Sequence, residues 1–275
     1  MHTKRKIIVV VKNILAFLVS FISMVPLILI LFNSFKTSQD AADMTLSFPS
    51  FPLLFENYTT VIEQGKLIVS FGNSMLYSCG SVILTIILAA MASYIFSRNK
   101  TKLNRFLYLY LILGITMPVN YVALFKVMSW LGLINSQPGL ILLYTAMQLP
   151  FSAFLIYGFV GQIPRELDEA AIIDGCKPIQ VFGRIVLPLL KPAIATASVL
   201  VFLNTWNEFS MPLYFMTSST KWPMTLSVYN FFGMYFTDWN LICADIVLTS
   251  LPVITIYLLG QKYIVSGMTA GSVKG

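Results

Sequence analysis

The sequence predicts an all-α integral membrane protein with six transmembrane helices, and three observations support this fold class. Of the 275 residues, 57% are hydrophobic and only 11% are charged, whereas about 25% are charged in a soluble domain. The apolar residues form long runs and lack the alternation that a membrane β-barrel needs. The positive charges gather in short clusters between these runs. We therefore expect one membrane domain that covers residues 1–275.

Six apolar runs are long enough to cross a bilayer, which takes about 20 residues. Because backbone N–H and C=O groups in lipid must bond within their own segment, such runs become helices. The first run follows a basic start, is uncharged from Asn13 to Phe35, and is long enough to favour a retained helix over a cleaved signal. The expected spans are residues 13–33, 70–96, 105–126, 138–160, 193–215 and 241–263.

The distribution of Lys and Arg predicts the orientation of the spans. Fourteen of the 18 residues lie in the N-terminal tail, the turn after the second span, the loop after the fourth span and the C-terminal end. The remaining four are Lys36, Lys66, Lys126 and Lys221. Because Lys and Arg are enriched in cytoplasmic loops, we expect both termini in the cytoplasm and the protein in the cell membrane.

Several function classes find no support in the sequence. The net charge is +7, but the charges do not form the single basic face that is typical of nucleic-acid binding. The cysteines are Cys79, Cys176 and Cys243. They are far apart and the one histidine is His2, so we expect no metal site. A phosphate-binding loop needs Gly-x4-Gly-Lys and then Ser or Thr, whereas Lys66 is followed by Leu67; we expect no ATP site in this chain.

Two loops on the expected outer side are rich in aromatic residues. Residues 34–69 hold Pro49, Pro52 and several aromatics. Residues 216–240 hold Trp222, Tyr229, Phe231, Phe232, Tyr235, Phe236 and Trp239. One interpretation is an aromatic belt at the lipid interface. The alternative is a docking surface for an external partner.

The most informative segment is the expected cytoplasmic loop, residues 165–188. Glu166, Asp168 and Glu169 place acids in the first turn of a short helix, where the helix dipole favours them. Gly175 suits a helix C-terminus that needs a left-handed residue, and Pro178 permits a second helix to begin. The loop is therefore predicted to form two short helices that are too polar to span the membrane.

One face of the first short helix has two interpretations. Leu167, Ala170, Ala171 and Asp174 share this face by their spacing. The small alanines would let another protein approach closely, and the acidic neighbours would orient it through Arg or Lys. The alternative is a solvated amphipathic connector. The residues alone leave both interpretations open.

The same loop resembles the EAA loop of ABC importer permeases. The pattern is Glu169-Ala170-Ala171, three residues, Gly175, nine residues, then Ile185-x-Leu187-Pro188. Further segments are similar to the carbohydrate-uptake, maltose-type branch and its smaller six-helix subunit. They are Glu56-Asn57-Tyr58, Leu131-Gly132-Leu133, Trp206-Asn207-Glu208 and the tail Gly267–Gly275. Cys176 departs from the alanine that the family often has.

This resemblance implies a role for the loop. The loop would form coupling helices in a cleft of a cytoplasmic ATPase subunit, with Glu169 as the charged anchor, Gly175 as the turn, and Ala170 and Ala171 as the close-packing surface. The expected coupling residues are Glu169, Ala170, Ala171, Asp174, Gly175, Ile185, Leu187 and Pro188. Closure of two ATPase subunits would move the membrane helices from inward-open to outward-open.

The resemblance also implies the partners and the function. They are a homologous second permease in a heterodimer, two cytoplasmic ATPase subunits that hold ATP and Mg, and an extracytoplasmic solute-binding protein. The chain would be no enzyme and would import a sugar or oligosaccharide. Two alternatives remain, an ion-coupled secondary transporter and a non-transport membrane scaffold.

Polar residues in the expected spans are candidates for a substrate path. Asn204, Asn207 and Glu208 share one helical face, and a charge near mid-bilayer costs at least about 2.5 kcal/mol, so it should face the bundle or water. A neighbouring aromatic ring suits a sugar. The alternative is hydrogen bonding between helices. The candidates are Asn204, Trp206, Asn207, Glu208, Asp245 and Gln148. No intramembrane histidine accompanies Asp245, which disfavours a proton relay.

Overall fold

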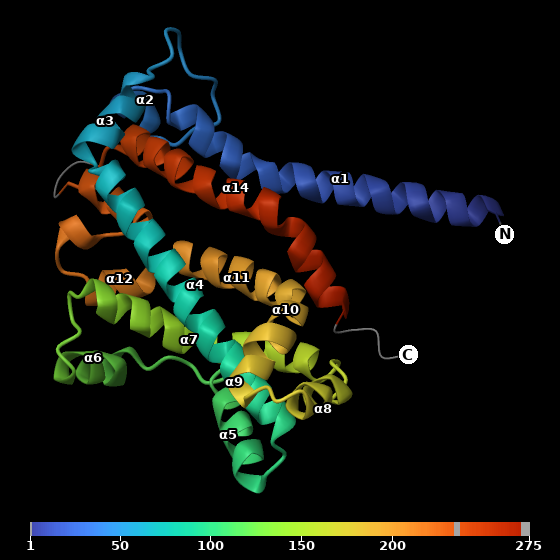
Figure 1. The fold of residues 1–275 in the computed structure, drawn as a ribbon. Coiled ribbons are helices and arrows are strands. Elements are labelled where there is room, and N and C mark those ends of the chain that lie inside the picture. Colours follow the sequence, from blue (N-terminus) through green and yellow to red (C-terminus); the bar gives the residue numbers. More distant parts are fainter. Residues whose placement is uncertain (1, 234–236, 271–275) are drawn as a thin grey trace. The chain divides into compact units, whose positions relative to one another are not determined.

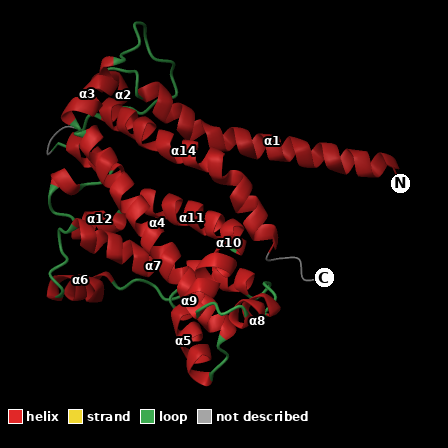
Figure 2. Ribbon diagram, viewed as in Figure 1, coloured by secondary structure: helices red, strands yellow, loops and turns green. Residues whose placement is uncertain are grey.

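The computed structural model describes the backbone of residues 2–233 and 237–270, and the side chains of 9–233 and 237–263. Within these ranges the protein is helical and has no strand beyond one isolated bridge between Phe232 and Thr237 (Figure 2). The all-α fold class is confirmed. Residues 271–275 of the tail motif, and Tyr235 and Phe236 of the outer aromatic loop, lie outside the described residues.

The chain divides into two compact units, which are described separately below. The first contains Met1–Ile68 and Ser227–Leu251, and the second contains Val69–Leu226 and Pro252–Gly275. Each boundary between the two units falls inside a helix, so one helix contributes residues to both units.

The first unit includes the N-terminal helix and the start of the last one. Its elements are α1 (His2–Asn33), α2 (Ser38–Ala41), α3 (Glu56–Gln64), η3 (Val228–Phe231) and the first part of α14 (Trp239–Ala270), shown in Figure 1. Asn57 of the Glu-Asn-Tyr motif is buried and donates to the carbonyls of Ser34 and Lys36 at 2.8 and 2.9 Å. Its Oδ1 accepts from Asn240 of α14 at 3.0 Å. This asparagine therefore joins three segments of the unit.

A buried lysine orders the loop after α1. The Lys36 side chain is only 3% exposed. Its ammonium group donates to Asn33 Oδ1 at 3.0 Å, to the carbonyl and hydroxyl oxygens of Thr45 at 2.9 and 3.0 Å, and to Ser47 Oγ at 3.1 Å. These bonds offset the cost of removing the ammonium from water, so the loop after α1 is folded around its own cation.

The second unit holds most of the long helices. Its elements are α4 (Leu67–Arg98), α5 (Lys102–Leu113), α6 (Tyr121–Trp130), α7 (Gln137–Val160), α8 (Glu166–Ile173), α9 (Pro178–Val181), the π-helical η1 (Phe182–Val186), α10 (Leu187–Leu189), α11 (Lys191–Trp206), α12 (Ser210–Phe215), η2 (Ser219–Lys221), α13 (Met224–Ser227) and the rest of α14. α13 ends in the first unit.

Small residues bring α4, α7 and α11 together in the second unit. Their buried core includes Ala89, Ala90, Ala153, Ala193 and Ala197. Ser93 of α4 donates to the Ala153 carbonyl of α7 at 2.9 Å. α11 packs along α7 (Figure 1). Close approach through small residues is the usual way that helices associate in lipid, where apolar bulk gives no driving force.

Four of the six expected spans are confirmed as single long apolar helices. They are Val9–Asn33, Leu67–Arg98, Gln137–Val160 and Trp239–Tyr263. In α1, every apolar side chain from Val9 to Met24 is exposed. Such a surface needs lipid or another subunit around it.

The expected span at 105–126 is wrong as a single helix. α5 ends at Leu113, and α6 begins at Tyr121. Pro118 lies between them and has no backbone N–H to continue a helix. Asn120 then starts α6, because its Oδ1 accepts from the Ala123 N–H at 3.0 Å. The 12 residues of α5 rise about 18 Å, which is short of the roughly 30 Å hydrocarbon core.

The expected span at 193–215 is also wrong as a single helix. α11 ends at Trp206, and α12 begins at Ser210. Its other end is bent as well, since the segment Pro178–Leu189 meets Lys191–Trp206 at 77°. If that bent pair counts as one span, the described residues contain five candidate spans.

The bend before α11 has a local cause. Pro188 and Pro192 are four residues apart and each lacks an N–H. The chain adapts with a π-turn, in which the Leu187 N–H donates to the Phe182 carbonyl five residues earlier. Such single-turn π-helices are a recognised response to an interrupted hydrogen-bond ladder.

We predict that Ala153→Leu lowers the free energy of unfolding by about 1–3 kcal/mol, because the added bulk has no space between α4 and α7. Thermal unfolding of the purified protein in detergent measures the loss. Ala146→Leu is the control, since Ala146 lies on α7 but is exposed. Equal stability of the two variants would contradict the described helix packing.

Candidate functional site

The short helix α8 has an inner and an outer face. Asp168 and Ala171, three residues apart, are buried. Glu166, Glu169 and Ala170 are exposed. The backbone N–H groups of Asp168 and Glu169 both donate to the Arg165 carbonyl, at 2.9 and 3.1 Å, which starts the helix. The outer face is therefore acidic, and the inner face is part of the protein core.

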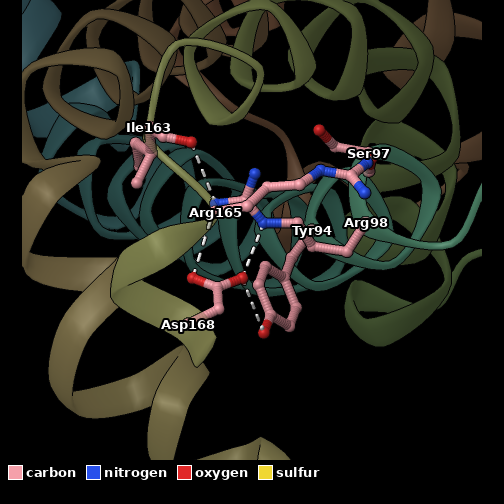
Figure 3. Close-up of polar contacts among 6 residues, drawn as sticks. All are labelled: Tyr94, Ser97, Arg98, Ile163, Arg165 and Asp168. Carbon is pink, nitrogen blue, oxygen red and sulfur yellow. Dashed lines mark hydrogen bonds and ion pairs between the residues drawn. The ribbon is translucent and has the colours of Figure 1, made fainter. Parts of the chain in front are cut away.

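An ion pair holds the inner face of α8 to the end of α4 (Figure 3). Arg98 Nε donates to Asp168 Oδ2 at 2.7 Å, and Arg98 Nη2 lies 3.4 Å from Asp168 Oδ1. The two side chains are only 13% and 11% exposed. The Tyr94 hydroxyl lies at 3.5 Å from the same carboxylate. A two-pronged arginine–carboxylate contact of this kind is strong and directional.

Two further bonds fix the same junction. Arg98 Nη2 donates to the Ile163 carbonyl at 3.2 Å, just before α8. Arg165 Nη2 donates back to the Ser97 carbonyl at 3.1 Å, at the end of α4 (Figure 3). Each segment thus supplies an arginine to the other, and α8 is attached to α4 on both sides of its start.

Gly175 ends α8 in the conformation that the sequence predicts. Its φ is +83°, in the left-handed region, and no other part of the protein comes within 4 Å of the place that a Cβ would take. The Cys176 N–H donates to the Ala171 carbonyl at 2.9 Å, and the Gly175 N–H donates to Ile172 at 3.0 Å. This pair of bonds is the Schellman arrangement. Glycine is needed here for the backbone angle and not for space.

The second half of the loop is anchored in the core of the same unit. Val181, Val186 and Leu190 are fully buried beside alanines of α7 and α11. Ile185 and Leu187 of the predicted pattern pack partly buried against this cluster. The inner side of residues 165–190 is therefore continuous with the membrane-helix core.

The predicted coupling residues fall into two groups. Glu169, Ala170, Asp174, Gly175 and Pro188 are exposed. Ala171, Ile185 and Leu187 face the core, Ala171 fully. The expectation that Ala171 packs against another protein is therefore wrong, because a side chain three residues from Asp168 shares its inner face.

Residues on both faces of this site are not predictable from local sequence pattern. Arg98 is one of several basic residues in the turn after the second span, and Asp168 is one of three acids in the first turn of its helix. Ile172 and Ile173 are exposed apolar side chains at the outer tip, Ile173 to 85%. The signal in the sequence was two isoleucines beside the turn glycine, where solvent alone would favour polar residues.

Two of the predicted path residues are brought together. Asn204 Nδ2 of α11 donates to Gln148 Oε1 of α7 at 3.2 Å, and Asn204 is exposed. This amide pair joins two helices, which is what the hydrogen-bonding interpretation predicts. Asn204 nevertheless stays exposed.

Trp206 is not at an accessible surface, so its place among the path candidates is wrong. The residue is 1% exposed. Its ring stacks on Phe202 at 5.5 Å and meets the edge of Phe71 at 6.0 Å. The ring is a core residue of α11.

Asn207 ends the helical face of Asn204, whereas Glu208 lies in the helix break. Asn207 is the C-cap of α11, and its Nδ2 donates to the Leu203 carbonyl at 2.9 Å. Glu208 Oε1 accepts from the N–H groups of Ser210 and Met211 at 2.7 and 3.1 Å. The carboxylate thus caps α12. The expectation of one polar stripe is wrong at Glu208, because α11 ends at Trp206 and Asn207 is its C-cap.

Asp245 belongs to the first unit. It is 1% exposed, and its two carboxylate oxygens accept from the Ser227 hydroxyl at 3.0 and 3.3 Å.

No group of three or more His, Cys, Asp or Glu side chains that could hold a metal ion occurs in the described part of the chain.

The aromatic loop at 216–224 is held by protein contacts. Trp222 donates to the Met216 carbonyl at 2.9 Å and packs on a core cluster that includes Tyr77. Asn73 of α4 donates to the carbonyls of Thr220 and Trp222 at 2.9 and 3.1 Å. The ring of Trp222 and its N–H therefore have partners within the fold.

Comparison with known proteins gives consistent matches. Residues 81–270 match the family described as "Binding-protein-dependent transport system inner membrane component". The diacetylchitobiose uptake system permease protein NgcG of Streptomyces coelicolor is 32% identical over 95% of this chain and 88% of its own. The multiple sugar-binding transport system permease protein MsmG of Streptococcus mutans is 34% identical over 91% and 92%.

The fold also matches a solved structure. A bacterial ABC transporter involved in the import of the acidic polysaccharide alginate superimposes with a TM-score of 0.82. The match covers 94% of this chain and 96% of that chain at 21% identity. It therefore supports the fold and not the substrate.

We predict that Asp168→Asn lowers the free energy of unfolding by about 2–3 kcal/mol, because it leaves the mostly buried Arg98 without its counter-charge. Glu169→Gln is the matched control, since the neighbouring carboxylate is exposed, and we expect a change within about 0.5 kcal/mol. Denaturant titration of the purified protein measures both. A control loss equal to the Asp168→Asn loss would contradict the inner and outer faces of α8.

We predict that Gly175→Ala destabilises the protein by about 1–2 kcal/mol, because alanine is strained at a positive φ. Gly183→Ala is the control. No atom lies within 4 Å of a Cβ at either glycine, but Gly183 has no positive φ. Thermal unfolding should separate the two variants. Tolerance of alanine at both positions would show that the left-handed turn is not required.

Proposed function

We propose that this chain, which belongs to the binding-protein-dependent transport system inner membrane component family, is the permease subunit through which an ATP-driven importer carries a sugar into the cell. The observation that carries the proposal is the loop 165–190, whose inner side is built into the membrane-helix core and whose outer side is exposed. Relatives named for sugar uptake support the substrate class.

We further propose six membrane crossings with both termini in the cytoplasm. Four crossings are the long helices, and a fifth is α11, the longer half of the bent pair. The sixth is the broken segment α5–α6, in which neither helix is long enough to cross alone. An even number of crossings puts both ends on one side, and the excess of Lys and Arg assigns that side to the cytoplasm.

The outer face of α8 is the proposed contact for the ATPase subunit. Glu169 supplies the charge, Ala170 permits close approach, and Ile173 supplies an exposed apolar contact. ATP and Mg bind to that partner, and this chain performs no chemistry. When two ATPase subunits close, their push on α8 reaches α4 through Arg98 and Asp168 and reaches α7 and α11 through the buried valines.

The remaining partners follow from exposed surfaces and from the family. A homologous second permease would cover part of the apolar surface of α1. A solute-binding protein would deliver the sugar to the outer side, where the folded loops after α1 and before α13 lie. For the sugar path within this chain, we retain Asn204 with Gln148 and leave out Trp206.

Reconstitution tests this function. The purified complex in vesicles should accumulate sugar only when ATP and the loaded binding protein are supplied. An uncoupler should leave uptake intact while ATP remains, whereas an ion-coupled secondary transporter would lose it. A membrane scaffold would give no sugar flux under any condition. Uptake without ATP hydrolysis would reject the proposal.

We predict that Glu169→Lys reduces co-purification of the ATPase subunit at least about tenfold, because a reversed charge at an interface commonly costs more than about 1.4 kcal/mol. The protein should remain folded, since Glu169 is exposed. Glu63→Lys is the control, with the same charge change at an exposed position on α3, on the proposed outer side. Loss of the ATPase from the Glu63→Lys protein alone would reverse the proposed orientation.

A further inference from the structure

A cavity of about 380 Å³ lies where the end of α4, the start of α5 and the side of α7 meet. It takes no part in the coupling loop or the sugar path described above. Its lining combines aromatic residues with two cations, and no acidic residue lines it.

The floor of the cavity is aromatic. The rings of Tyr108 and Tyr157 are stacked with centroids 4.1 Å apart. Phe96 meets Tyr108 edge to face at 6.0 Å. These contacts join α4, α5 and α7, so the floor is fixed by three helices and not by a mobile loop.

The rim of the cavity is positively charged. Lys100 and Arg105 line it together with the amide of Asn99. Among the described side chains, the ion pair found is Arg98 with Asp168, so neither Lys100 nor Arg105 has a carboxylate partner there. Both cations are exposed at the edge of the cavity.

The start of α5 strengthens this positive potential. The 12-residue helix has no acid in its first turn and begins at Lys102. Thr101 caps it, accepting from the Asn104 N–H at 3.1 Å. A helix N-terminus carries a partial positive charge that disfavours cations. An anion in the cavity would relieve the repulsion between the helix end and the surrounding basic side chains.

An apolar surface adjoins this charged rim. α5 has no buried residue. Leu103, Phe106 and Tyr110 are each more than 60% exposed within this chain. In a membrane such side chains face acyl chains. A free phosphate would use the rim alone, whereas a lipid would use both the rim and this surface.

We propose that the cavity binds the phosphodiester headgroup of an anionic phospholipid. Basic pockets between spans on the cytoplasmic side are suited to such headgroups. The proposal rests on the proposed function only for the side of the membrane, since it places Lys100 and Arg105 at the cytoplasmic leaflet.

Native mass spectrometry of the intact complex tests this site. The complex is purified with equal amounts of phosphatidylglycerol and phosphatidylcholine, and the lipid retained on it is counted. We expect preferential retention of phosphatidylglycerol. Lys100→Gln with Arg105→Gln should weaken that retention about thirtyfold. Each basic side chain near an anionic headgroup contributes a binding free energy that, for two side chains together, corresponds to about this factor.

Two control variants separate the cavity from general charge and from misfolding. Lys12→Gln with Lys262→Gln removes two exposed positive charges away from the cavity lining and the start of α5, and should keep the wild-type retention. Lys100→Arg with Arg105→Lys keeps the charge in the cavity and should also retain phosphatidylglycerol. The proposal would be overturned if the variant without Lys100 and Arg105 retained phosphatidylglycerol unchanged. It would also be overturned if the control that changes Lys12 lost phosphatidylglycerol to the same extent.

A second arm distinguishes the two sources of phosphate. Inorganic phosphate is added in excess to the wild-type complex. If phosphate binds while phosphatidylglycerol shows no preference over phosphatidylcholine, the cavity is a free-anion site and the lipid proposal is wrong. Sugar uptake by the same complex is measured separately. If the complex retains phosphatidylglycerol but takes up no sugar, the proposed function is rejected and the lipid site is supported.

Discussion

The geometry of the proposed coupling surface depends on the attachment of its inner side, above all on the ion pair between Arg98 and Asp168. A short helix of eight residues has little stability alone, so α8 keeps its position only through tertiary contacts. The 2.7 Å contact and the reciprocal bonds of Arg98 and Arg165 to backbone carbonyls supply them. A push on the outer face is therefore a push on α4.

Helix breaks determine much of the rest of the second unit. Each break leaves backbone N–H groups that lipid cannot satisfy. The break after α11 gives two of these groups to the Glu208 carboxylate, and the start of α6 gives one to Asn120. A polar side chain in an apolar run can thus serve the backbone of its own segment. This is why the polar stripe expected around Glu208 does not exist as one face.

The same unit keeps one polar contact with a different character. Asn204 and Gln148 bond across two helices and Asn204 stays accessible. Trp206, two residues further and on the opposite side of α11, is enclosed by Phe71 and Phe202. One side chain can therefore join two helices by a hydrogen bond and also line a path, provided that it stays exposed as Asn204 does.

The sequence by itself determined the features that depend on local pattern. Long apolar runs predicted four of the spans, and the spacing around Gly175 predicted the two short helices and the left-handed turn, because a positive φ is a property of one residue. Only the tertiary structure decided which side of α8 faces inward, that Arg98 pairs with Asp168 seventy positions away, and that Trp206 is enclosed. Those outcomes depend on which helices meet, and residue spacing within one helix carries no information about its neighbours.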